Sequence, residues 1–131
     1  AGLVGITAGA DVVSINASLF IGAVAGIIVV FAAITLDKFH LDDVVGAVSV
    51  HLVCGIWGTL AVGIFSVNPD HTFVTQLIGV LAYGAVSFPV AFLIFFVLKK
   101  TIGIRVSEEH ELRGLDSTEH GIRGYTIIYD E

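Results

Sequence analysis

The sequence predicts an all-α membrane protein, and the prediction rests on three apolar runs, at residues 14–36, 44–65 and 73–98. A helix needs roughly 20 apolar residues to cross a bilayer, and none of the runs contains Asp, Glu, Lys or Arg. The chain is 56% hydrophobic with a mean hydropathy of +0.95. A soluble domain of 131 residues would lack the polar surface to cover three such helices. We therefore expect a transmembrane region over 1–98 and a polar tail over 99–131.

The basic residues predict how the spans are oriented. Five of the six follow the last run and the sixth, Lys38, lies between the first two runs. The positive-inside rule then places the 37–43 loop and the C-terminal tail in the cytoplasm. The tail also holds seven acidic residues, which favours a solvated segment over one that binds nucleic acid.

The first seven residues, AGLVGIT, have the composition of the end of a further apolar helix. The sequence has no methionine and no segment that resembles a signal peptide. We therefore expect the chain to be part of a longer membrane protein with earlier spans.

The first apolar run carries small residues at four-residue steps, Ser18, Gly22 and Gly26. This spacing favours close approach of another helix, a packing role without chemistry. In the loop that follows, Asp42 or Asp43 is well placed to cap the next helix and to meet its positive N-terminal dipole.

The second run carries a histidine, His51, roughly 10 Å from its cytoplasmic end at 1.5 Å per residue. On an α-helix its face would carry Ala47, Cys54, Gly55 and Gly58, all small, which leaves either a close helix contact or a narrow lumen beside the imidazole. Position alone leaves two interpretations open, a pore residue or a core histidine bonded by a neighbouring helix. A metal site is less favoured, because no second ligand lies three or four residues away.

The tail predicts two short helices. Ser107 followed by acids is typical of an N-cap, and Gly114 stands where a glycine would end that helix. Asp116 with Glu119 three residues later gives a second capping signal. Composition leaves open whether these helices are merely solvated or dock on a partner.

Two motifs together resemble one family. They are DDVVGAVSVHLVCGIWGTL at 42–60 and GIRVSEEHELRGLDSTEHG at 103–121, the latter followed by Tyr125. With the opening AGLVGIT they resemble, in order and spacing, the C-terminal part of the ammonium transporter (Amt/Mep/Rh) family. The resemblance covers essentially the whole chain.

The resemblance implies an eleven-span homotrimer of the cell membrane, of which this chain supplies the end of span eight, spans nine to eleven and the cytoplasmic tail. Each protomer of the family has a hydrophobic pore in which ammonium is deprotonated, ammonia crosses and paired histidines relay the proton. His51 matches the pore histidine of span ten, Ala47 a pore-lining position and Asp43 a structural, helix-capping aspartate. Thr7 is expected to approach the pore from span eight.

For the tail, the resemblance implies regulation through packing under a neighbouring protomer and through a PII-type signalling protein. The matching residues are Gly114, Asp116, Thr118, His120, Gly121 and Tyr125. Three positions depart from common family residues: Val44, Leu52 and Arg123. The resemblance implies a transporter with no cofactor, metal or enzymatic site. The alternatives to transport are an ammonium sensor and a membrane scaffold.

Overall fold

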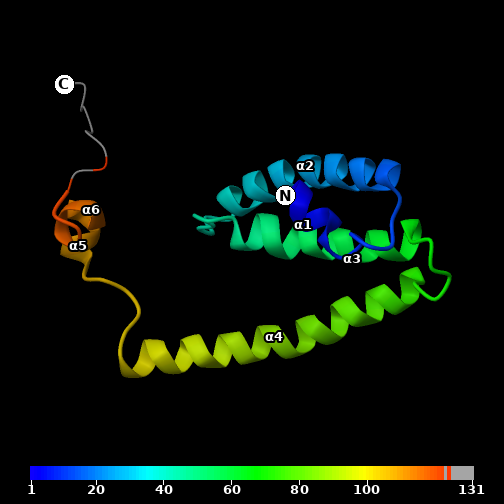
Figure 1. The fold of residues 1–131 in the computed structure, drawn as a ribbon. Coiled ribbons are helices and arrows are strands. Elements are labelled where there is room, and N and C mark those ends of the chain that lie inside the picture. The colour runs from blue at the N-terminus through cyan, green and yellow to red at the C-terminus, as the bar shows by residue number, and fades with distance from the viewer. Residues whose placement is uncertain (123, 125–131) are drawn as a thin grey trace. The chain divides into compact units, whose positions relative to one another are not determined.

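The computed structural model describes residues 1–122 and 124, which form helices and connecting turns (Figure 1). The helices are α1 (Gly2–Thr7), α2 (Ile15–Lys38), the π-helix η1 (Ala47–Val53), α3 (Cys54–Phe65), α4 (Phe73–Thr101), α5 (Glu108–Arg113) and α6 (Leu115–Thr118). The chain divides into two compact units, Ala1–Ser87 and Phe88–Glu131. Within the described residues the only β-pairing is an isolated bridge, so the predicted all-α class is confirmed.

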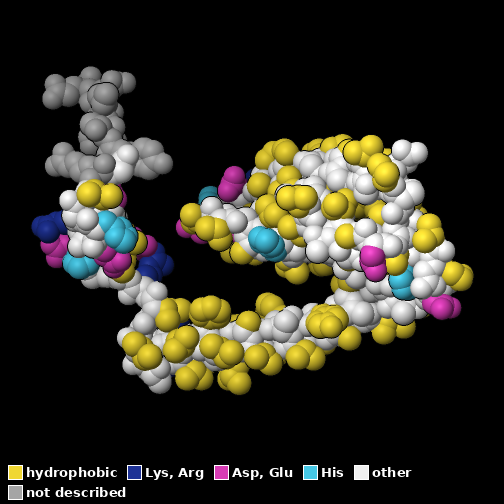
Figure 2. Space-filling view, in the orientation of Figure 1, with side chains coloured by type: hydrophobic (Ala, Val, Ile, Leu, Met, Phe, Trp, Pro, Cys, Tyr) yellow, Lys and Arg dark blue, Asp and Glu magenta, His cyan; other side chains and the backbone are white. Residues whose placement is uncertain are grey.

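Among the described residues, three helical segments are long and apolar enough to cross a membrane, namely Ile15–Lys38, Ala47–Phe65 and Phe73–Thr101. The second consists of η1 and α3 joined without a break. Figure 2 shows hydrophobic side chains over the outer faces of the long helices, and charged side chains of both signs on α5 and α6. This distribution is that of a multi-pass membrane protein, since apolar surface faces lipid rather than water.

In the first unit, the short helix α1 packs against both α2 and α3 (Figure 1). Glycines permit this: the backbones of Gly2 and Gly22 meet, and a Cβ on Gly58 would collide with the carbonyl of Gly5. Gly26, the last member of the predicted small-residue stripe, has no described neighbour from another segment within 4 Å of where its Cβ would lie. The stripe therefore makes its close backbone contact at Gly22 and not along its whole length.

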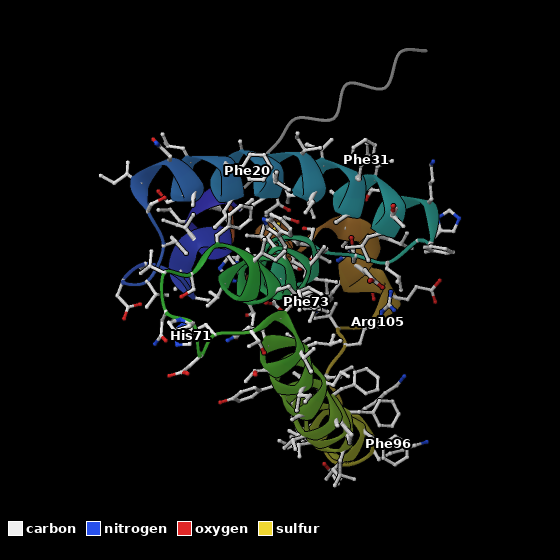
Figure 3. The ribbon with its side chains drawn as sticks, turned by 90° about the vertical axis from the view of Figure 1, so that its right-hand side faces the viewer. Phe20, Phe31, His71, Phe73, Phe96 and Arg105 are labelled. Carbon is white, nitrogen blue, oxygen red and sulfur yellow. The ribbon has the colours of Figure 1, made fainter. Side chains whose placement is uncertain are left out.

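The loop between α1 and α2 is hydrogen-bonded to the loop between α3 and α4. The N–H of Val67 donates to the carbonyl of Val12 at 2.8 Å, beside the bridge between Val13 and Ser66. His71, labelled in Figure 3, lies in the turn before α4, with its Nδ1 3.0 Å from the hydroxyl of Ser66. These bonds fix the turn that leads from α3 into α4.

The second unit begins within α4 and contains α5 and α6. Its part of α4 carries stacked aromatic rings, Phe88 on Phe92 and Phe92 on Phe96, and the ring of Phe96 points outward in Figure 3. The Nζ of Lys100 lies 5.9 Å from the centroid of the Phe96 ring. The end of α4 thus passes from aromatic to basic residues, as expected for a helix leaving a bilayer.

The tail helices have the first capping signal but not the second. The hydroxyl of Ser107 accepts from the N–H of His110, and Gly114 ends α5 with a φ of 86°. The second predicted cap is wrong: α6 begins at Leu115 after Gly114, which places Asp116 inside its first turn. The positive φ of Gly114 stops one helix and starts the next, so no residue is left between them for a separate cap.

Candidate functional site

The site begins with the turn that starts the second membrane helix. Gly46 has a φ of 69°, which favours glycine, and the helix begins after it at Ala47 rather than at Val44 where the apolar run starts. One oxygen of the Asp43 carboxylate accepts from the N–H of Val48 at 2.9 Å. The other accepts from the N–H of Ser49 at 2.8 Å and from its hydroxyl at 2.6 Å. Asp43 therefore satisfies backbone donors that the first turn leaves without helical partners.

These bonds also set the charge of Asp43. Its pKa is lowered below the usual carboxyl value, first by the hydroxyl of Ser49 and then by the N–H groups of Val48 and Ser49. Each of these donors favours the ionised carboxylate. A negative charge at this point complements the positive end of the helix dipole.

The segment that carries His51 is a π-helix and not an α-helix. The carbonyl of Gly46 accepts from the N–H of Val50 at 2.9 Å and from that of His51 at 3.3 Å, five residues on. π-helical turns are rare and frequently occur at functional sites.

His51 is exposed and lines an open cleft of about 390 Å³ between the second membrane helix and the first half of α4. Apolar surface dominates the walls, with a few polar side chains among it. The other lining residues are Leu52, Gly55, Ile56, Thr59, Gln76, Gly79, Val80, Tyr83, Gly84 and Ser87. An apolar cleft with a few polar groups suits a small solute that carries little charge.

The predicted small face beside His51 is only partly present. Gly55 lines the cleft with His51, but Cys54 and Gly58 are buried on another side. The thiol of Cys54 lies 3.5 Å from the carbonyl of Ala25 on α2, and Gly58 faces α1. The prediction assumed an uninterrupted α-helix, and the π-helical turn rotates the residues after it relative to those before it.

Ala47 and Thr7 occupy exposed positions away from the described lining of the His51 cleft. Ala47 is the first residue of η1. The hydroxyl of Thr7 donates to the carbonyl of Leu3 on its own helix. A pore role for either residue stays a prediction.

The tail residues form local contacts. The hydroxyl of Thr118 donates to the carbonyl of Gly114 at 3.0 Å, and the carboxylate of Asp116 accepts from the N–H of Gly124 at 2.7 Å. His120 and Gly121 are exposed, and Tyr125 lies outside the described residues. Arg105 pairs with Glu111 at 2.6 Å, which raises the pKa of the Arg105 guanidinium.

Sequence reasoning missed two kinds of residue at the site. Gln76 and Tyr83 line the cleft from α4. With Val80 and Ser87 they follow one another at steps of four, three and four residues, which marks one helix face. Ser49 was missed because a serine in an apolar run is usually taken for a packing residue. The available signal was its position two residues before His51.

Comparison with known proteins identifies the family. The family model described as Ammonium Transporter Family matches residues 1–125. The chain belongs to the ammonium transporter family. It is 47% identical over 99% of its length to a candidate ammonium transporter of Synechocystis sp., covering 30% of that protein. It is 41% identical over 95% of its length to ammonium transporter Amt2 of Archaeoglobus fulgidus, covering 31% of it, and 37% identical over 97% to an ammonium transporter of Aquifex aeolicus, covering 33% of it.

The chain spans about a third of the length of these curated relatives. The family match over residues 1–125 confirms the resemblance to the ammonium transporter family that the two sequence motifs predicted.

Proposed function

We propose that this chain belongs to a transporter that moves ammonium across the membrane through a hydrophobic pore, and that His51 lines that pore. Ammonia crosses the apolar part of the path and the imidazole takes part in relaying the proton. The observation that carries the proposal is the family match over residues 1–125, which includes His51. Transport of this kind needs no cofactor and no enzymatic step.

The physical argument concerns the cost of charge in an apolar path. Removing the water from an ammonium ion inside hydrocarbon costs far more than removing it from neutral ammonia. An imidazole supplies both a donor and an acceptor without a fixed charge, so it can hydrogen-bond ammonia and pass a proton. The apolar walls around His51 and its exposure to the cleft support this role.

The placement in the cell follows from the basic residues. We propose that the 37–43 loop and the 99–131 tail lie in the cytoplasm, with the protein in the cell membrane. Asp43 then caps its helix at the cytoplasmic side. Ala47 and Thr7 are proposed as further pore-lining residues.

We propose a homotrimer whose tails regulate transport. The tail residues Gly114, Asp116, Thr118, His120, Gly121 and Tyr125 would contact a neighbouring protomer or a PII-type protein. The exposed charges of α5 suit such a transient contact better than a buried one (Figure 2).

The test is ammonium uptake by the full natural protein with His51→Ala. We expect transport or its selectivity against other cations to change while the oligomer still assembles. The control is His40→Asn, which removes an imidazole from the loop before the helix at a φ of 55° that asparagine tolerates. Unchanged flux and selectivity in His51→Ala would remove His51 from the mechanism and favour a sensor or scaffold.

A further inference from the structure

The π-helical segment Ala47–Val53 needs a source of stability, because its hydrogen-bond pattern is rare and is normally held by surrounding contacts. Ser49 lies within it and is 4% exposed, the one buried polar side chain among the residues that the structure describes. A buried hydroxyl is costly unless it is hydrogen-bonded. The bonds of Ser49 therefore show what holds the segment.

Ser49 connects the turn before the π-helix to the residue after it. Its hydroxyl donates to the Asp43 carboxylate at 2.6 Å, a short distance typical of a bond to a charged acceptor. Its carbonyl lies 3.5 Å from the thiol of Cys54, which is fully buried and also contacts the carbonyl of Ala25. The serine thus joins the start of η1 to its end and, through Cys54, to α2.

The direction of His51 depends on this register. A π-helical turn holds about one residue more than an α-helical turn, and one residue corresponds to roughly 100° of rotation. Cys54 and Gly58 are fixed against α1 and α2. If η1 relaxed to an α-helix while α3 stayed in place, the imidazole would rotate away from the cleft.

We infer that Ser49 is a positioning residue for His51: with Asp43 it holds residues 47–53 in the π-helical register that directs the imidazole into the cleft. Ser49 is not proposed to touch the solute. The positioning rests on the geometry of this chain, whereas its effect on transport rests on the function proposed for His51.

The test uses the full natural protein in lipid bilayers, labelled with ¹⁵N in histidine. The ring signals of His51 are assigned by their loss in His51→Ala. In Ser49→Ala we expect these signals to move and the ammonium uptake rate to fall about tenfold or more, since misplacement of a reacting group by 1 Å can cost about 100-fold. Ser49→Thr keeps the hydroxyl and is expected to restore both the signals and the rate.

The matched control is Ser18→Ala, since the hydroxyl of Ser18 donates to the carbonyl of Ile15 on its own helix at 2.7 Å. It should leave the His51 signals and the uptake rate unchanged. Ser49→Ala with wild-type signals would overturn the inference. If His51→Ala leaves uptake unchanged, the proposed function fails, but the ring signals still test the positioning.

A second variant covers the case in which Ser49→Ala does not fold. In the wild type, three donors bond to the two carboxylate oxygens of Asp43. Asp43→Asn leaves only one acceptor oxygen for them. We expect the same ring signals to move in the same direction. If they stay at their wild-type positions, the clamp does not set the direction of His51.

Discussion

The packed helices α1, α2 and α3 differ from the long helix α4, although both regions are apolar. α1, α2 and α3 meet through small residues, and their buried residues include Ala25, Cys54 and Ala61. α4 is bulkier, with four phenylalanines in its second half, yet none of its residues is buried. The two regions therefore differ in the size of the side chains where helices could meet, and not in hydrophobicity.

The difference follows from the solvent. In water an exposed phenylalanine would be driven into a core, but lipid tails are as apolar as the side chain, so nothing drives the rings of α4 inward. Helices in lipid associate where backbones approach closely, and glycine allows the closest approach. Gly58 against Gly5 is such a contact.

The largest effect on stability is expected from Gly58→Ala. Its methyl group would collide with the backbone of Gly5, and backbone cannot move aside as the end of a side chain can. Overpacking of this kind costs about 1–3 kcal/mol, and we expect the upper part of that range. Thermal unfolding of the full natural protein measures the loss.

The control for that variant is Gly26→Ala, since among the described residues no other segment lies within 4 Å of the added methyl group. Alanine favours a helix over glycine by about 1 kcal/mol, so this variant should be neutral or slightly more stable. Equal losses in the two variants would mean that the close contact between α1 and α3 does not stabilise the protein.

A smaller effect is expected from Trp57→Phe, which leaves an aromatic ring but removes a bond between helices. The indole Nε1 donates to the carbonyl of Ile21 on α2 at 3.0 Å. That carbonyl lies in a helix, where it also accepts a backbone bond, so it is not left unsatisfied in the variant. The lost indole bond should therefore cost only about 1 kcal/mol of unfolding free energy. The measurement is the unfolding midpoint. A loss equal to that of Gly58→Ala would make a polar bond, not close packing, the main link within the unit.

The sequence predicted the membrane spans and the cap at Ser107 because length, composition and capping residues are local signals. It did not predict the π-helix, because one extra residue in a turn leaves no trace in an apolar run. The error at Cys54 and Gly58 follows directly, since faces were assigned with 3.6 residues per turn. Gln76 and Tyr83 were missed because their position beside His51 depends on a contact between distant segments.

The smallest effect is expected from Phe92→Ala in the aromatic row of α4. Its ring stacks on Phe88 and Phe96 with centroid distances of 6.4 and 6.2 Å, yet it is 64% exposed. Exposed substitutions usually change stability by no more than about 0.5 kcal/mol, and lipid can replace the lost ring contacts.

Thermal unfolding of Phe92→Ala beside Gly58→Ala then sharpens the contrast between the two regions. A near-wild-type midpoint is expected, because only the neighbouring rings of Phe88 and Phe96 are known to contact this exposed ring among the described residues. A loss as large as that of Gly58→Ala would mean that protein rather than lipid covers the aromatic face of α4. Side-chain size at helix contacts would then no longer distinguish α4 from the helices α1, α2 and α3.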